Sequence, residues 1–186
     1  MRNVENKEDR LLLERLRKGY ADGLKPIYEK YKIDMLAVAI AMAPDRPTAE
    51  DVVHDVFISF AGIARYIKIR KNLKSYLLTC IANRIRNIKK VDCHCAASIG
   101  NMDSVVRTNI LPDHVLTAAE EGERLQQALA ALPDSQKEVI LLHHMEGLRF
   151  QTIAKSQGES INTIQSRYRY GMRKMRAFFA GGNKNV

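Results

Sequence analysis

Residues 150–169 read FQTIAKSQGESINTIQSRYR and have the spacing of a helix-turn-helix. Ala154 is small enough to let a second helix approach closely, and Gly158, four residues later, suits a turn that needs a positive φ. Ile164, six residues further on, is placed to fill the space between the two helices. The spacing therefore predicts two short helices joined by a tight turn.

The second of these helices carries side chains that suit DNA. Ile153 and Ile161 are expected to complete the small core around Ile164, and Ser160 is a suitable N-cap. Amides, hydroxyls and guanidinium groups are the side chains that bind base edges and phosphates. The candidates are Asn162, Thr163, Gln165, Ser166, Arg167, Arg169 and Arg173. An ordinary helical hairpin with a basic surface is the alternative, but both the spacing and the charge favour DNA binding.

Charge falls into three blocks along the 186 residues, whose formal net charge is +9. Residues 1–91 carry +8, residues 92–146 carry −6 and residues 147–186 carry +7. Residues 56–91 contain no acidic side chain at all. Clustered lysines and arginines neutralise phosphates, so two polyanion-binding surfaces are expected. For either basic block taken alone, an ordinary solvated basic face is the alternative.

Helical spacing dominates the chain and strand signals are almost absent, which predicts an all-α fold. Thr48 is expected to cap the third helix. Residues 91–117 lose the periodicity and are predicted to form a flexible linker between two small domains, residues 1–90 and 118–180. The expected helices cover residues 7–17, 24–43, 49–61, 73–90, 116–132, 133–145, 150–156 and 161–178.

Several protein classes are excluded by composition. The longest apolar run, residues 35–43, is far shorter than the roughly 20 residues of a bilayer span. The first nine residues lack the apolar core of a signal peptide. Three cysteines provide no paired disulfide framework, which favours a reducing cytoplasm. Integral membrane proteins and cystine-rich secreted proteins are therefore not expected.

Motifs for bond chemistry are missing from the sequence. It contains no phosphate-binding Walker loop, no nucleophile elbow and no His-Glu-x-x-His zinc motif. Cys93, His94 and Cys95 stand too close together for a structural zinc site, which needs four ligands at wider spacing. We expect these three to be linker residues, with no metal, no cofactor and no catalytic residue in the chain. Metal or redox sensing by them is the less favoured alternative.

Four segments resemble extracytoplasmic-function (ECF) sigma factors of the sigma-70 family. Residues 131–154, ALPDSQKEVILLHHMEGLRFQTIA, and residues 162–176, NTIQSRYRYGMRKMR, resemble the family's region 4. Residues 49–57, AEDVVHDVF, look like region 2.2, and residues 73–83, LKSYLLTCIAN, look like the helix of regions 2.3 and 2.4. The segments follow the family's order, so chance agreement is improbable.

The resemblance implies that the helix of residues 49–61 binds the β′ clamp helices of core RNA polymerase. At about 100° per residue, Val52 and Val56 fall on one side of this helix, which would build the core. The opposite side carries the residues implied to contact polymerase, Asp51, His54 and Asp55. A plain solvated face is the alternative. His54 replaces an amide that is commoner in the family.

For the acid-free segment, the resemblance implies melting of the −10 promoter element and capture of the non-template strand. Cations would follow the backbone, and amides would read base edges. The implied residues are Lys68, Arg70, Lys71, Asn83, Arg84, Asn87 and Lys90. Tyr66 and Tyr76 could stack on bases, although Tyr76 is more readily a core residue. Tyr76 and Ala61 stand where tryptophan is common in the family.

In region 4, the resemblance implies that the second helix of the helix-turn-helix enters the major groove at the −35 element. Residues 170–172, Tyr-Gly-Met, replace a more usual Arg-Ala-Arg. Glycine inside a helix costs about 1 kcal/mol, so the helix is expected to bend or fray beyond Gly171. Gln165, Ser166, Arg167 and Arg169 are accordingly weighted above Arg173.

Together, these observations predict a cytoplasmic RNA polymerase sigma factor that is not an enzyme. Its implied partners are core RNA polymerase, through the β′ clamp helices and the β flap, and promoter DNA. Because the family is commonly held inactive by an anti-sigma factor, the resemblance also implies such a partner. The main alternative is a homodimeric helix-turn-helix repressor at palindromic sites. A nucleic-acid-processing enzyme is a third class, and the chain lacks acid–base or metal constellations for it.

Overall fold

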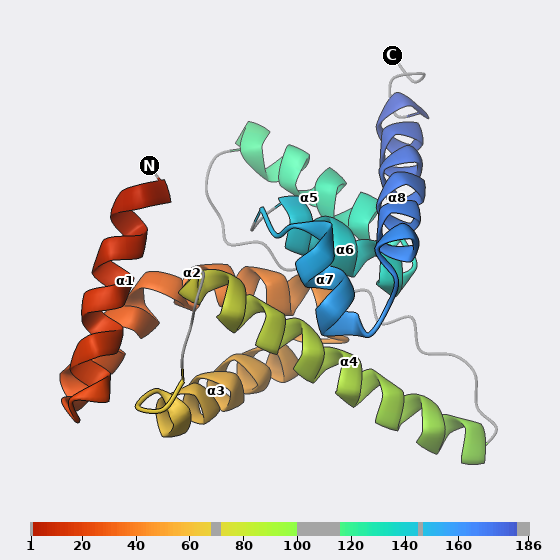
Figure 1. The fold of residues 1–186 in the computed structure, drawn as a ribbon. Coiled ribbons are helices and arrows are strands. Elements are labelled where there is room, and N and C mark those ends of the chain that lie inside the picture. The colour runs from red at the N-terminus through yellow and green to blue at the C-terminus, as the bar shows by residue number, and fades with distance from the viewer. Residues whose placement is uncertain (1, 68–71, 100–115, 145–146, 182–186) are drawn as a thin grey trace. The chain divides into compact units, whose positions relative to one another are not determined.

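The computed structural model describes residues 2–67, 72–99, 116–144 and 147–181, and within these ranges it contains helices and no strands (Figure 1). The predicted all-α fold is confirmed. The chain divides into two compact units, residues 1–99 and 100–186, which are described separately.

The first unit consists of four α-helices and a short 3₁₀ turn within the described residues. In chain order these are α1 Arg2–Arg17, η1 Ala21–Gly23, α2 Leu24–Met42, α3 Arg46–Ile63 and α4 Leu73–Ile99. Helix α2 packs against both α3 and α4, and α3 packs against α4. The largest fully buried side chains come from all three helices: Ile27, Met35, Phe60, Leu73, Leu77, Leu78, Ile81 and Ile85. Each such side chain stabilises the unit by about 1.5–3 kcal/mol.

A buried carboxylate fixes α1 against α2. Asp9 is only 4% exposed, and the Tyr31 hydroxyl lies 2.8 and 2.7 Å from its two carboxylate oxygens. Lys30 Nζ lies 2.9 Å from Asp9 Oδ1 and 2.6 Å from Glu8 Oε2. Burial alone would lower the pKa of Lys30, but its hydrogen bonds to Glu8 and Asp9 raise that pKa above its ordinary value. This network satisfies the buried charge, which would otherwise be strongly destabilising.

Helix α3 is capped by Asp45, so the prediction that Thr48 is its N-cap was wrong. Asp45 has extended backbone dihedrals, and its Oδ1 accepts the Thr48 N–H at 2.8 Å. Pro47 lies in the first turn, where a missing N–H costs nothing. Because Thr48 donates to the carboxylate from its backbone and its side chain, it lowers the pKa of Asp45.

Helix α4 runs nine residues past the predicted end at residue 90 and stops at Ile99. Residues 91–99 contain no glycine or proline, and Gly100 is the first residue with a strong tendency to end the helix. The segment with Cys93, His94 and Cys95 is therefore helical in its backbone. The rest of the predicted linker up to residue 115, and the side chains of these three residues, lie outside the described part.

The second unit contains α5 Leu116–Ala130, α6 Asp134–His144, α7 Phe150–Gln157 and α8 Ile161–Gly181. Helix α8 packs against each of the other three, and α6 also packs against α7. Val139, Leu142, Ile153 and Ile164 are completely buried and form the centre of this unit. Across the described residues of the whole chain, the helices fall short of the length and hydropathy of a bilayer span.

Gly171 is a close-packing site, and the predicted bend or fray beyond it is wrong. Helix α8 continues from Gly171 to Gly181. Gly171 is buried, and a Cβ added there would lie 2.7 Å from Ile140 Cδ1 and 3.2 Å from Gln136 Cβ. Glycine at this position lets α8 lie directly against α6. Its low helix propensity is offset by packing with a helix that is distant in sequence.

We expect Gly171→Ala to lower the free energy of unfolding by about 1 kcal/mol. Overpacking typically costs 1–3 kcal/mol, which exceeds the roughly 1 kcal/mol that alanine gains in a helix. Gly62→Ala is the matched control, because a Cβ at Gly62 in α3 meets nothing within 4 Å. Urea unfolding should show that Gly62→Ala is neutral or stabilising. Adding Ile140→Val, which deletes the Cδ1 atom, should relieve part of the Gly171→Ala defect. Equal stabilisation by both alanines would contradict this account.

Candidate nucleic-acid interface

Helices α7 and α8 form the predicted helix-turn-helix, with the turn at Gly158. The φ of Gly158 is +68°, in the left-handed region that favours glycine. The Glu159 N–H donates to Ala154 O at 3.0 Å, which closes the end of α7. Ser160 Oγ accepts the Thr163 N–H at 3.0 Å, so the predicted N-cap of α8 is confirmed.

The small core between the two helices is mostly as predicted. Ile153, Ala154 and Ile164 are all buried. Ile161, however, is 40% exposed, so its predicted place in this core was wrong. It is the first residue of α8, and it lies at the exposed end of the helix beyond the packing contact between α7 and α8.

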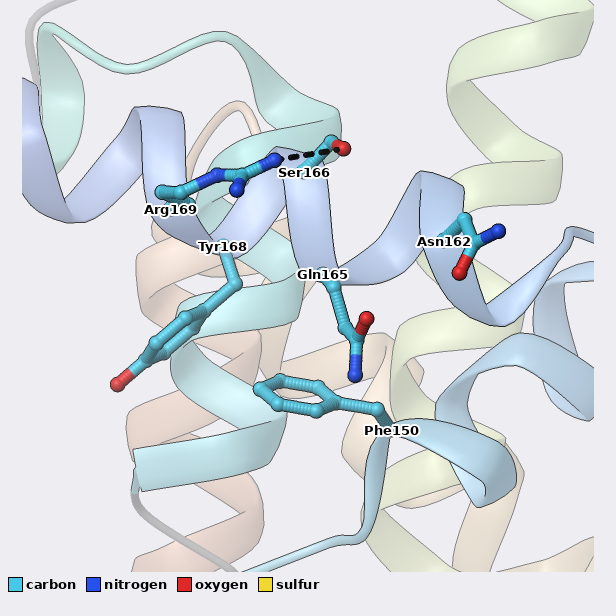
Figure 2. A pocket seen from close by; sticks show the side chains of 6 residues that line it. All are labelled: Phe150, Asn162, Gln165, Ser166, Tyr168 and Arg169. Carbon is cyan, nitrogen blue, oxygen red and sulfur yellow. Dashed lines mark hydrogen bonds between the residues drawn. The ribbon is translucent and has the colours of Figure 1, made fainter.

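Four of the predicted DNA-binding side chains gather on one face of α8. Asn162, Gln165, Ser166 and Arg169 follow the i, i+3, i+4, i+7 spacing of a single helix face. Together with Phe150 and Tyr168 they line an open hollow of about 370 Å³ (Figure 2). Arg169 Nη2 lies 3.4 Å from Ser166 Oγ. We call these four residues the reading face; it combines amide, hydroxyl and guanidinium groups.

The other predicted residues of α8 lie outside this hollow. Arg167 Nη2 forms an ion pair with Glu159 Oε1 at 2.6 Å, and its Nη1 donates to Gln157 Oε1 at 3.0 Å. Thr163 Oγ1 lies 2.8 Å from Ser160 Oγ at the cap. The Arg173 guanidinium lies 5.0 Å from the centre of the Tyr170 ring. Arg167 thus ties the turn to α8, and Thr163 belongs to the cap.

An aromatic cluster beside the hollow was not predicted from the sequence. The His143 ring stacks on Phe150 with centroids 4.2 Å apart, and the Tyr168 hydroxyl lies 2.8 Å from His144 Nε2. His143 Nδ1 lies 2.8 Å from Leu148 O, and because a carbonyl only accepts, this nitrogen carries the proton. The one sequence signal for this cluster was Tyr168, which lies four residues after the buried Ile164 and therefore on the same side of α8 as Ile164.

In the first unit, the predicted polymerase-contact residues lie together on the outer side of α3. Asp51, His54 and Asp55 are exposed, whereas Val52 and Val56 on the opposite side are buried. The amphipathic pattern predicted for this helix is therefore present.

One of these acids, Asp55, reaches the neighbouring helix. Its Oδ2 lies 3.0 Å from Arg84 Nη2 of α4, and both side chains are about half-exposed. An ion pair this exposed contributes at most about 1 kcal/mol, so either group can exchange it for another partner.

The predicted −10 residues are divided between α4 and a segment that the structure does not describe. Arg84, Asn87 and Lys90 are exposed on α4. Asn83 is half-buried, and its Oδ1 accepts from Arg86 Nη1 at 3.1 Å. Lys68, Arg70 and Lys71 lie outside the described residues.

The two candidate stacking tyrosines differ in their surroundings. Tyr66 is 82% exposed, so its ring is accessible to a base. Tyr76 is half-buried, with its ring centre 6.4 Å from that of Phe60. Burial, together with the nearby Cys80 thiol, raises the pKa of Tyr76 to about 12. Tyr76 is therefore neutral at physiological pH and belongs partly to the core.

No cluster of three or more His, Cys, Asp or Glu side chains suited to a metal ion occurs among the residues that the structure describes. The side chains of Cys93 and its neighbours are not among them. The described surface thus offers amides, hydroxyls and cations on helices α4 and α8, which suits binding to a polyanion.

Two family models match this chain, one in each unit. Sigma-70 region 2 matches residues 27–90, and Sigma-70, region 4 matches residues 122–175. The reading face lies inside the second match, and the exposed acids of α3 lie inside the first. These acids are therefore placed on the region 2 domain.

Relatives and solved structures agree with both matches. The chain is 23% identical over 175 residues to the ECF RNA polymerase sigma factor SigW of Bacillus subtilis, covering 88% of this chain and 92% of that protein. It is 26% identical over 170 residues to the ECF RNA polymerase sigma factor SigK of Mycolicibacterium vanbaalenii, covering 89% and 86%. The sigma factor RpoE from Bartonella quintana, solved with the anti-sigma factor NepR, has a TM-score of 0.67 at 22% identity over 84% of this chain and 96% of that one. CnrH, solved with the cytosolic domain of CnrY, has a TM-score of 0.66 at 17% identity over 94% and 98%.

Proposed function

The chain belongs to the ECF group of the sigma-70 family and is an RNA polymerase sigma factor, and from this premise we propose which of its residues contact promoter DNA and which contact core polymerase. The homodimeric repressor is not favoured, because a repressor would not need the region 2 match in the first unit. We assign residues 1–90 to the region 2 domain, 91–117 to the linker and 118–180 to the region 4 domain.

The reading face of α8 is proposed to recognise the −35 element in the major groove. Gln165 and Asn162 carry amides that can pair with adenine N6 and N7, and Arg169 can pair with guanine O6 and N7. Thr163, Arg167 and Arg173 are proposed to contact phosphates around the same site. The gathering of four such side chains on one helix face is the observation that carries this assignment.

Helix α4 and the segment before it are proposed to bind the −10 element. Asn83 and Asn87, one turn apart, would contact bases of the opened strand, while cations bind its backbone. These cations are Lys68, Arg70, Lys71, Arg84 and Lys90. Tyr66 is the better placed of the two tyrosines to stack on a base, because its ring is exposed.

Asp51, His54 and Asp55 are proposed to contact the β′ clamp helices of core RNA polymerase, with the region 4 domain near the β flap. Exposed carboxylates on one helix side suit basic groups of a partner. Asp55 would exchange Arg84 for such a group, which would leave Arg84 available to DNA.

Three further assignments follow from membership of the family. We propose that the protein acts in the cytoplasm, where promoter DNA and polymerase are found. We propose that it catalyses no bond chemistry itself and needs no cofactor. Because the sigma factor RpoE was solved with the anti-sigma factor NepR, and CnrH with the cytosolic domain of CnrY, we propose an anti-sigma factor as a further partner of this protein.

Glu159 is expected to weaken DNA binding, because it holds Arg167 and is the sole acid in residues 147–186. Glu159→Gln should tighten binding to promoter DNA about threefold. It should also steepen the slope of log affinity against log salt concentration by the amount expected for about one more phosphate contact. Filter binding of the holoenzyme across a salt series measures both quantities. Glu29→Gln, which removes an acid from α2, is the control and should change neither. Unchanged affinity in Glu159→Gln would contradict this role.

Recovery of promoter DNA tests the assignment as a whole. Purified protein is mixed with core polymerase and genomic fragments, and the retained DNA is sequenced. We expect two shared motifs at −35 and −10 spacing in the retained fragments. Palindromic sites bound without core polymerase would instead indicate a repressor.

A further inference from the structure

Phe150 brings an apolar ring to a hollow whose other walls are largely polar. It is the first residue of α7, yet it lines the same hollow as Gln165 and Arg169 of α8. Figure 2 shows the Gln165 side chain extending toward the Phe150 ring. The hollow is therefore not made by α8 alone, because Phe150 of the preceding helix forms one of its walls.

The position of the Phe150 ring is fixed by its neighbours. It stacks on His143 with an interplanar angle of 20°, and its centre lies 5.2 Å from that of Tyr168. The His143 ring is itself held by its hydrogen bond to Leu148 O. A ring held in this way presents a preformed surface, and a contact with it requires little ordering on binding.

An apolar ring suits one group of the major groove in particular. Among the base edges there, the 5-methyl group of thymine is apolar, and phenylalanine is one of the side chains that contact it. Cytosine lacks this methyl group, and a phenyl ring offers a phosphate neither a hydrogen-bond donor nor a positive charge. Gln165, beside the ring, can hydrogen-bond an adenine N6 and N7, and adenine is the partner of thymine.

We propose that Phe150 is a specificity-determining residue of this interface, and that the hollow receives the 5-methyl group of a thymine in the base pair read by Gln165 or in its neighbour. This inference rests on the proposed −35 role of the reading face and deepens it. It makes the specificity of the site a joint property of α7 and α8.

The test replaces each thymine of the −35 element in turn by deoxyuridine, which removes only the methyl group. Binding of full-length promoter duplex by the reconstituted holoenzyme is then measured. With the natural protein, we expect about fourfold weaker binding at one position, the effect of losing one buried methyl contact. The measurement changes the DNA, so the folding of the protein does not affect it.

Protein variants then assign the effect to a side chain. Phe150→Ala should bring the thymine-to-uracil ratio at that position close to one, and Phe150→Leu should keep a reduced preference for thymine. Because the ratio is taken within one protein, a general loss from weaker packing on His143 cancels. Ile161→Ala is the control: this exposed aliphatic residue of α8 lies outside the hollow, and the fourfold ratio should persist.

Each other outcome has a definite meaning. If no thymine is sensitive while the holoenzyme still selects its −35 element, the inference is overturned and the proposed function stands. If a sensitive thymine stays sensitive in Phe150→Ala, a different side chain reads the methyl group and the inference is overturned. If the holoenzyme selects no promoter at all, both the inference and the proposed function fall.

Discussion

Replacing both Asp51 and Asp55 by lysine is expected to abolish binding to core RNA polymerase. Both carboxylates are exposed on the outer side of α3, so the change should reverse the charge of that side without entering the core. Losing the partner of an interfacial charge pair costs about 2–5 kcal/mol. For two such residues we expect at least a 100-fold loss of affinity, since each 1.4 kcal/mol is tenfold.

A second charge-reversed variant, with half of this change in net charge, separates the effect of position from that of net charge. Glu29→Lys makes the same kind of reversal on α2, at a half-exposed glutamate that pairs with Lys32. Fluorescence titration with labelled core enzyme should give nearly natural affinity for Glu29→Lys. Urea unfolding should show at most about 1 kcal/mol of change for the double variant, which loses the exposed Asp55–Arg84 ion pair, and less for Glu29→Lys. Natural affinity in the Asp51 and Asp55 double variant would refute the proposed polymerase contact.

The second large effect is expected at the reading face. Gln165→Ala and Arg169→Ala should each cost about 1–3 kcal/mol of discrimination between the correct −35 base and its replacements. Together they should nearly abolish selection of the −35 element, because both side chains lie in the same hollow. Competition between cognate and altered −35 duplexes for holoenzyme measures this loss.

Arg176→Ala provides the comparison for the reading face. Arg176 is exposed on α8 but lies about two turns beyond Arg169 and does not line the hollow. Its loss should at most weaken binding equally for all sequences and leave the preferred −35 bases unchanged. Equal loss of sequence preference in Arg176→Ala would contradict the assignment of the reading face.

The helix-turn-helix could be predicted because its determinants are local. Ala154, Gly158 and Ile164 specify the helix contact, the left-handed turn and the buried plug within 11 residues. The amphipathic pattern of α3 is local as well. Ile161 was misplaced because periodicity puts it on the face of Ile164, while the packing contact has already ended at the first residue of α8.

Features that depend on distant partners could not be predicted in this way. Gly171 looks like a weak point of α8 until Ile140 of α6 is known to lie against it. Asp55 and Arg84 are 29 residues apart, and only the packing of α3 on α4 brings them together. Phe150 lines the same hollow as the reading face only because α7 packs against α8.

Helix ends depend on competing local signals, and here the stronger signal was not the one expected. Asp45 competes with Thr48 for the N-cap of α3, and the carboxylate prevails. Residues 91–99 lack an apolar stripe, yet nothing in them breaks a helix, so α4 continues. Loss of periodicity therefore did not mark the end of this helix.

Transcription in vitro is the most direct test of the central claim, that one chain both docks on polymerase and selects the promoter. A promoter recovered with the holoenzyme is transcribed by purified core enzyme with and without this protein. The account predicts a defined transcript that requires the natural protein and disappears both with the Asp51 and Asp55 lysine variant and with the Gln165 and Arg169 alanine variant. A transcript that forms equally well with either variant, or without the protein, would contradict it.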